Sequence, residues 1–199
     1  MLKNSATGLV IVSLAASLAF AGKFNKVLSV GSPAPDWANV QGTDDKQHSL
    51  SDYKDAKVVV VIFTCNHCPV AQQYEERLIQ LQNEFKNRDV QLIALSVSQG
   101  AEDNLAAMKA HAQERKFNFP YLSDLTQLSG RAYGAQKTPE AFVLDRDRKV
   151  VYIGGVDDSW ADATAVKKTY LRDAIEAALD GRSPAVPETR PLGCGIEYQ

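Results

Sequence analysis

Residues that build metal clusters or disulfide frameworks are scarce: the 199-residue chain has three cysteines, three histidines, two methionines and two tryptophans. So low a cysteine count excludes a small scaffold held together by many disulfides. Charge of one sign is also lacking, since the net charge is −2 and the basic residues form no stripe, which argues against binding to nucleic acid. The sequence shows no internal repeat and no second domain, so one domain with its own core is expected.

An uncharged, mostly apolar run occupies residues 8–20, behind the short basic segment Met1–Asn4. The run is too short to span a bilayer comfortably, and an A-x-A cleavage pattern ends at Ala21. We therefore expect residues 1–21 to be a signal peptide. The mature protein would be periplasmic or secreted, in a compartment where disulfides persist, and membrane-bound only if the segment is not cleaved.

The most informative stretch is Cys65-Asn66-His67-Cys68-Pro69. Before it, residues 58–63 are apolar without alternation and rich in β-branched side chains, which is typical of a strand buried on both faces. After it, residues 70–88 carry apolar side chains at three- and four-residue steps, which predicts an amphipathic helix. Two cysteines that open a helix at the end of a buried strand predict a redox-active pair, because the helix N-terminus favours a thiolate.

The remaining pattern alternates strands and helices. A short N-terminal hairpin comes first, and a second one is expected near the end over residues 141–153. Between them we expect a buried strand over 90–97 and helices over 101–116 and 126–133; a last helix should cover 167–180. This order predicts an α/β fold, with a central mixed β-sheet flanked by helices and an extra N-terminal β-hairpin.

The domain boundaries follow from the same pattern. Residues 22–30 are expected to be a mobile lead-in, and residues 31–182 to form the folded domain. Residues 183–199 are rich in proline and glycine and predict a flexible tail, which carries Cys194. An unpaired cysteine of an exported protein deserves note, and Cys194 could relay electrons, pair with another molecule or stay idle.

The Cys-x-x-Cys motif at the end of the first core strand makes the chain resemble the thioredoxin fold over about residues 31–181. Residues 31–36 and 49–53 look like the redoxin branch, which includes the alkyl-hydroperoxide-reductase/thiol-specific-antioxidant (AhpC/TSA) proteins. The Cys-Asn-His-Cys-Pro motif and the Gly-Cys-Gly-Ile tail at 193–196 are similar to a peroxiredoxin-like group of bacterial thioredoxin-family proteins. The resemblance implies that Pro139 is cis and that Thr138 lines the substrate groove.

Cys65 is the predicted attacking thiolate, at the helix tip, and Cys68 is the predicted resolving sulfur. His67 is expected to stabilise the thiolate and, as in similar DsbA-like oxidants, to raise the reduction potential above that of thioredoxin. Asn66, the neighbouring residue, is expected to take part in tuning the redox properties of the pair. The predicted activity is thiol–disulfide exchange with protein thiols, by a monomer without cofactor or metal. The redox partner that recharges it is not identified by the sequence.

Other interpretations remain open. A zinc half-site would need two more ligands from His48, His67 or His111, and a copper module could use the same cysteines. A thiol peroxidase would use Cys68, but the family motif has a threonine where Cys65 stands. Haem attachment is disfavoured because Cys68 is followed by proline rather than histidine. Thioredoxins carry a buried acid in the strand before the motif, and residues 58–63 contain none, so the proton acceptor for Cys68 is not identified.

Overall fold

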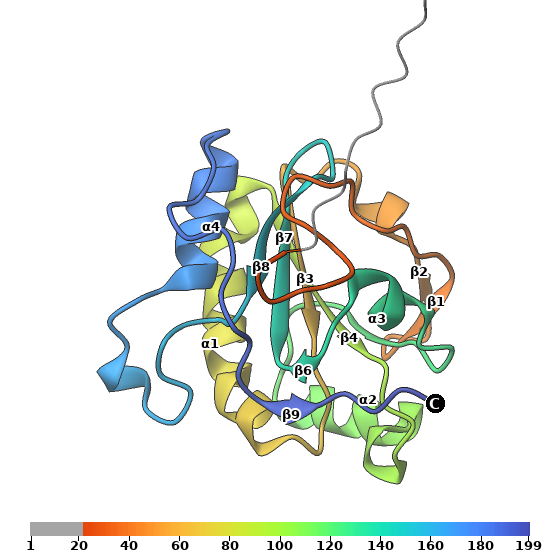
Figure 1. Cartoon of the computed structure of the whole chain (residues 1–199). Helices are drawn as coiled ribbons and strands as arrows, with labels where there is room; N and C mark the ends of the chain where they lie inside the picture. The colour runs from red at the N-terminus through yellow and green to blue at the C-terminus, as the bar shows by residue number, and fades with distance from the viewer. Residues whose placement is uncertain (1–21) are drawn as a thin grey trace, which may run out of the picture.

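The computed structural model describes residues 22–199, and the predicted signal peptide lies outside the described residues (Figure 1). Its centre is a seven-stranded sheet in the order β2-β1-β5-β4-β3-β7-β8. The strands β3 (Val58–Phe63), β4 (Val90–Ser96) and β5 (Tyr121–Ser123) are parallel neighbours. All six residues of β3 are buried, as expected for a strand covered on both faces.

Antiparallel strands close the sheet at both sides. On one side β7 (Glu140–Leu144) pairs with β3 and with β8 (Val150–Gly154). On the other side the hairpin of β1 (Val40–Gly42) and β2 (Gln47–His48) pairs with β5. The predicted mixed sheet with an extra N-terminal hairpin is therefore confirmed.

Helices cover both faces of this sheet. The helices α1 (Pro69–Phe85), α2 (Leu105–Glu114) and α4 (Tyr170–Leu179) pack on one face, where Tyr74, Met108 and Leu171 join the core. Figure 1 shows α1 and α4 side by side on that face. The short helix α3 (Leu128–Tyr133) packs on the other face. Among the described residues, no helix has the length and apolar character needed to cross a membrane.

The helix expected over residues 101–116 is broken. Residues 101–103 form a 3₁₀ turn, Asn104 is extended, and its side chain accepts the N–H of Ala107 to cap α2. Asparagine favours such a cap because its side chain satisfies an N–H group that the first helical turn leaves free. The break leaves Asp103 fully buried instead of on a solvent-facing helix.

The lead-in and the tail are packed against the domain, unlike the mobile segments expected. Asn25 is fully buried and donates to the carbonyl of Tyr133. The Glu188 carboxylate accepts the N–H groups of Lys23 and Asn25, which ties the two ends together. Further along the tail, β9 (Cys194–Gly195) pairs antiparallel with β6 (Lys137–Thr138).

Candidate active site

The helix after the motif begins later than expected, behind the second cysteine rather than at the first. Helix α1 starts at Pro69, and Cys68 is its N-cap, so Cys65 lies in the loop before the helix rather than at its tip. Proline explains the position of this boundary. It has no N–H group to leave unpaired, and its fixed φ suits the first helical residue, which makes the preceding residue the cap.

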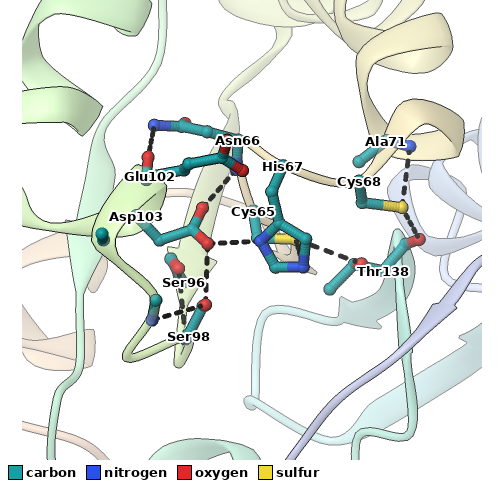
Figure 2. Close-up of polar contacts among 12 residues, drawn as sticks. Cys65, Asn66, His67, Cys68, Ala71, Ser96, Ser98, Glu102, Asp103 and Thr138 are labelled. Atoms are coloured by element: carbon teal, nitrogen blue, oxygen red, sulfur yellow. Dashed lines mark hydrogen bonds and ion pairs between the residues drawn. The ribbon is translucent and has the colours of Figure 1, made fainter.

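Cys68 is fully buried between α1 and Thr138, the last residue of β6, which directly precedes Pro139. Its sulfur accepts the N–H of Ala71 at 3.4 Å and lies 3.1 Å from the carbonyl oxygen of Thr138 (Figure 2). The carbonyl favours the protonated thiol, whereas thiol donation from Cys65 and Cys194 and the N–H of Ala71 favour the thiolate. The donors outweigh the carbonyl and burial, and donation from Cys65 contributes most, so the pKa of Cys68 is lowered to about 4.

Cys65 is 4% exposed and faces a different set of groups. Its sulfur lies 3.4 Å from Oγ1 of Thr138 and 3.8 Å from Nε2 of His67. Its hydrogen bond to Cys68 and its burial raise the pKa of the Cys65 thiol, and the charge of Asp103 raises it further. The reduced pair therefore holds its negative charge on Cys68, while Cys65 keeps its proton.

Asp103 is the site residue that the sequence did not reveal. Its buried carboxylate accepts the N–H of Asn66 at 2.6 Å, the hydroxyl of Ser98 at 2.7 Å and a bond from Nδ1 of His67. Figure 2 shows the His67 ring between this carboxylate and Cys65. Because Nδ1 is bound to Asp103, Nε2 is the nitrogen that faces the sulfur. A thiol, an imidazole and a carboxylate thus follow one another, which is the order found in Cys–His arrangements that activate thiols.

Asn66 holds the loop that carries His67. Its side chain donates to the carbonyl of Glu102 at 2.8 Å and accepts the hydroxyl of Tyr121 at 3.0 Å. Gln72 donates to its carbonyl at 2.6 Å. The described contacts of Asn66 therefore connect the loop to the Asp103 segment and to β5, and fix where His67 points.

The Thr138–Pro139 bond is cis, as the resemblance implied. Thr138 contacts both sulfurs, with its hydroxyl toward Cys65 and its carbonyl toward Cys68. The next residue, Glu140, is 1% exposed, and burial raises its pKa to about 7. No acid lies in β3, but β7 places Glu140 directly opposite Phe63, the last residue of β3.

Cys194 also lies at the site, brought there by the tail. It pairs with Thr138 in the β6–β9 register and packs against Cys65, Cys68 and Ala71. Burial and a hydrogen bond with Cys68 raise the pKa of Cys194 to about 11.

A cavity of about 460 Å³ opens beside Cys65. Cys65, His67 and Thr138 line it, together with residues 97–103 of the Asp103 segment and residues 195–197 of the tail. Neither Cys68 nor Cys194 is part of its wall. A molecule in this cavity would therefore meet the sulfur of Cys65 and not that of Cys68.

Donor atoms of Cys65, His67 and Asp103 lie within 4.8 Å of one another, which is compatible with metal ligands. Asp103 already binds three donors, so an ion would have to break its bond to His67 or rely on Cys65 and His67. Two ligands could hold copper(I) but are fewer than a structural zinc site uses. His48 and His111 do not join them, because each is bonded to a carboxylate elsewhere.

The sheet order, the dithiol before the first core helix and the cis-proline corner define a protein of the thioredoxin-like class. The chain belongs to the redoxin family, whose family model matches residues 29–169.

Relatives of known structure resemble the whole described domain. An uncharacterized conserved protein from Geobacillus kaustophilus is 33% identical with a TM-score of 0.81, covering 88% of this chain and 95% of that one. A hypothetical protein from Sinorhizobium meliloti is 27% identical with a TM-score of 0.81, covering 88% and 97%. Thiol-disulfide oxidoreductase ResA from Bacillus cereus is 27% identical over 134 residues, which are 66% of this chain and 74% of ResA.

Proposed function

We propose that this protein is an exported thiol–disulfide oxidoreductase in which Cys65 attacks and Cys68 resolves. The proposal rests on one observation: the two cysteines of the pair lie in different environments. Cys65 lines the cavity beside His67, and Cys68 lies buried behind it at the N-cap of α1. Similarity to the thiol-disulfide oxidoreductase ResA supports the same activity.

The reaction begins with the proton of Cys65. His67 Nε2 accepts it, and the Asp103 carboxylate stabilises the imidazolium through Nδ1. The Cys65 thiolate then attacks a client disulfide, which forms a mixed disulfide and releases one client sulfur. The Cys68 thiolate attacks Cys65, closes the Cys65–Cys68 disulfide and releases the second client sulfur. The client gains two electrons, the pair loses two, and the reverse sequence oxidises a client dithiol.

The client approaches through the cavity rather than along β6. In this structure the edge of β6 is paired with β9, so Thr138 offers its hydroxyl to the cavity while its backbone is engaged by the tail. We therefore assign Thr138 and the cis-Pro139 corner to positioning the client sulfur opposite Cys65. Protein thiols are the expected clients, with a separate redox partner to recharge the pair.

Variants of the pair test this assignment. Reduction of a model disulfide such as that of insulin should be lost in Cys65→Ser, whereas Cys68→Ser should still form a mixed disulfide that alkylation can trap. His67→Ala should slow the exchange, and His48→Ala, which alters a histidine bonded elsewhere, is the matched control. Exchange that persists in Cys65→Ser would overturn the assignment.

The direction of the reaction in the cell follows from the reduction potential of the pair. A value near ≈ −120 mV would identify an oxidant and one near ≈ −270 mV a reductant. We expect His67 to raise the potential, so His67→Ala should lower it in a glutathione titration. Export is tested separately, by determining whether the mature protein begins at Gly22.

One observation favours a second candidate, a thiol peroxidase. Cys68 is an N-cap cysteine followed by proline, with a lowered pKa, which suits a sulfur that attacks peroxide. Its complete burial and the position of the cavity favour Cys65 instead. Hydroperoxide consumption that is retained in Cys65→Ser and lost in Cys68→Ser would support the peroxidase.

A further inference from the structure

The C-terminal tail places its cysteine against the active-site pair. Figure 1 shows β9 alongside β6, the strand that leads to the proline corner. In the register of this pair Cys194 stands opposite Thr138, whose carbonyl oxygen lies 3.1 Å from the sulfur of Cys68. An extended segment paired at a sheet edge presents its side chains at fixed positions, so Cys194 is held at the site and not merely near it.

Contacts on both sides of Cys194 anchor the tail. Before it, the hydroxyl of Thr189 bonds the N–H of Gly155 at 3.0 Å. After it, the N–H of Ile196 donates to the carbonyl of Gln136 at 3.0 Å, and Gln127 donates to the carbonyl of Glu197 at 2.9 Å. These bonds link the tail to three separate segments of the domain.

Glycine at 193 permits the close approach. Its φ is +151°, and a Cβ atom there would lie 1.9 Å from the carbonyl oxygen of Thr138. Any other residue would have to push the tail away from β6. The chain therefore carries, directly before its third cysteine, the one residue type that lets this segment dock.

Three sulfurs consequently lie in sequence, with Cys68 in the middle. Cys65, Cys68 and Cys194 pack in one cluster, and Cys68 influences the pKa of both other thiols. Cys65 lines the cavity, while Cys194 is partly exposed and lies outside the cavity wall.

We propose that Cys194 is a third redox residue, which receives the disulfide from the Cys65–Cys68 pair by attacking Cys68. The proposal rests on the proposed function and deepens it. The Cys194 thiolate bonds to the sulfur of Cys68, the Cys65–Cys68 bond breaks, and Cys65 leaves as a thiolate that takes up the proton released by Cys194. No electrons enter or leave the protein in this step. Cys65 becomes free for another client, while the disulfide moves to the partly exposed tail, where a redox partner can reach it.

The charge on Cys68 controls when the step occurs. While the pair is reduced, the hydrogen bond with Cys68 helps to keep Cys194 protonated, because it adds to the effect of burial on the pKa of Cys194. Oxidation of the pair consumes the Cys68 thiolate and removes that contribution. Cys194 is thereby more readily deprotonated when a disulfide is present to be attacked.

Two serine variants separate the geometry of this step from the client reaction. Cys65→Ser leaves Cys68 and Cys194, which oxidised glutathione should link into an intramolecular disulfide. Cys68→Ser leaves Cys65 and Cys194, and neither of these thiols shifts the pKa of the other among the described groups. Because contacting thiols have an effective concentration of millimolar or more, the first variant should close its disulfide at least about tenfold faster than the second. Peptide mapping without reductant identifies the bond, and circular dichroism confirms that both variants fold.

Gly193→Ala in the Cys65→Ser background gives a second measurement. It should slow the Cys68–Cys194 linkage by displacing β9, while Gly193→Ala alone should still form the Cys65–Cys68 disulfide. Equal linkage in the two serine variants, or glutathione adducts on Cys68 and Cys194 without a bond between them, would overturn the relay. Failure of the wild-type protein to reduce insulin would instead refute the proposed function, whether or not Cys194 forms a disulfide.

Discussion

Glu140 provides a test of how burial beside the proline corner affects stability. Its side chain is 1% exposed, and Oε2 accepts the N–H groups of Gln136 and Lys137 at 2.7 and 3.2 Å. Oε1 has no hydrogen-bond partner among the described residues. Burial, with a smaller contribution from Glu188, raises its pKa from 4.5 to about 7. Such a difference corresponds to about 3 kcal/mol between the two protonation states.

The sign follows from proton binding. Below pH 4.5 the carboxyl is protonated in both the folded and the unfolded chain, and its contribution to stability is fully present. Between pH 4.5 and about 7 the unfolded chain releases the proton that the folded chain retains, so stability falls as the pH rises. Above that range the folded protein carries a buried, half-satisfied carboxylate, and the whole of the roughly 3 kcal/mol is lost.

Glu140→Gln removes the ionisation while keeping an oxygen that can accept both N–H groups. Urea unfolding should show the variant gaining on the wild type by up to about 3 kcal/mol between pH 4.5 and pH 8. Glu114→Gln changes an exposed glutamate on α2 and serves as the control, with no comparable pH dependence. A stability difference between Glu140→Gln and the wild type that stays constant across this range would refute the reasoning.

Two further variants test the contacts that hold His67 in position. Asp103→Asn removes the charged acceptor of the His67 bond and should slow alkylation of Cys65 by about 10- to 100-fold, the loss expected for a hydrogen bond to a charged group. If Asp103 acted only through its charge, which raises the pKa of Cys65, alkylation would become faster instead. Asn66→Ala removes the acceptor of the Tyr121 hydroxyl and the donor to Glu102. It should cost about 1–3 kcal/mol in thermal or urea unfolding, and an unchanged stability would show that these bonds do not hold the loop.

The sequence predicted the sheet and the main helices because their signals are local. Residues 58–63 are rich in β-branched side chains because their strand is buried on both faces. The apolar side chains of α1 recur at helical spacing because one face of the helix is buried. The cis bond before Pro139 was predicted from the family resemblance, not from propensity.

The missed features depend on contacts between distant residues. Asp103 lies 37 positions from Asn66, in a segment whose composition indicated a continuous helix, and its carboxylate is buried where that helix is interrupted before the Asn104 cap. The tail is rich in proline and glycine, which usually indicates a flexible segment. Its docking depends on backbone pairing over two residues and on the missing side chain at Gly193, and neither leaves a periodic pattern.

Thr138 connects these separate parts of the site. Its hydroxyl lies 3.4 Å from Cys65, its carbonyl oxygen lies 3.1 Å from Cys68, and its backbone pairs with Cys194. A disulfide carries no thiolate charge, so closing the Cys65–Cys68 bond removes the negative charge of Cys68 that lies beside the carbonyl oxygen of Thr138. The oxidation state of the pair therefore changes the electrostatic surroundings of the strand residue that pairs with the tail.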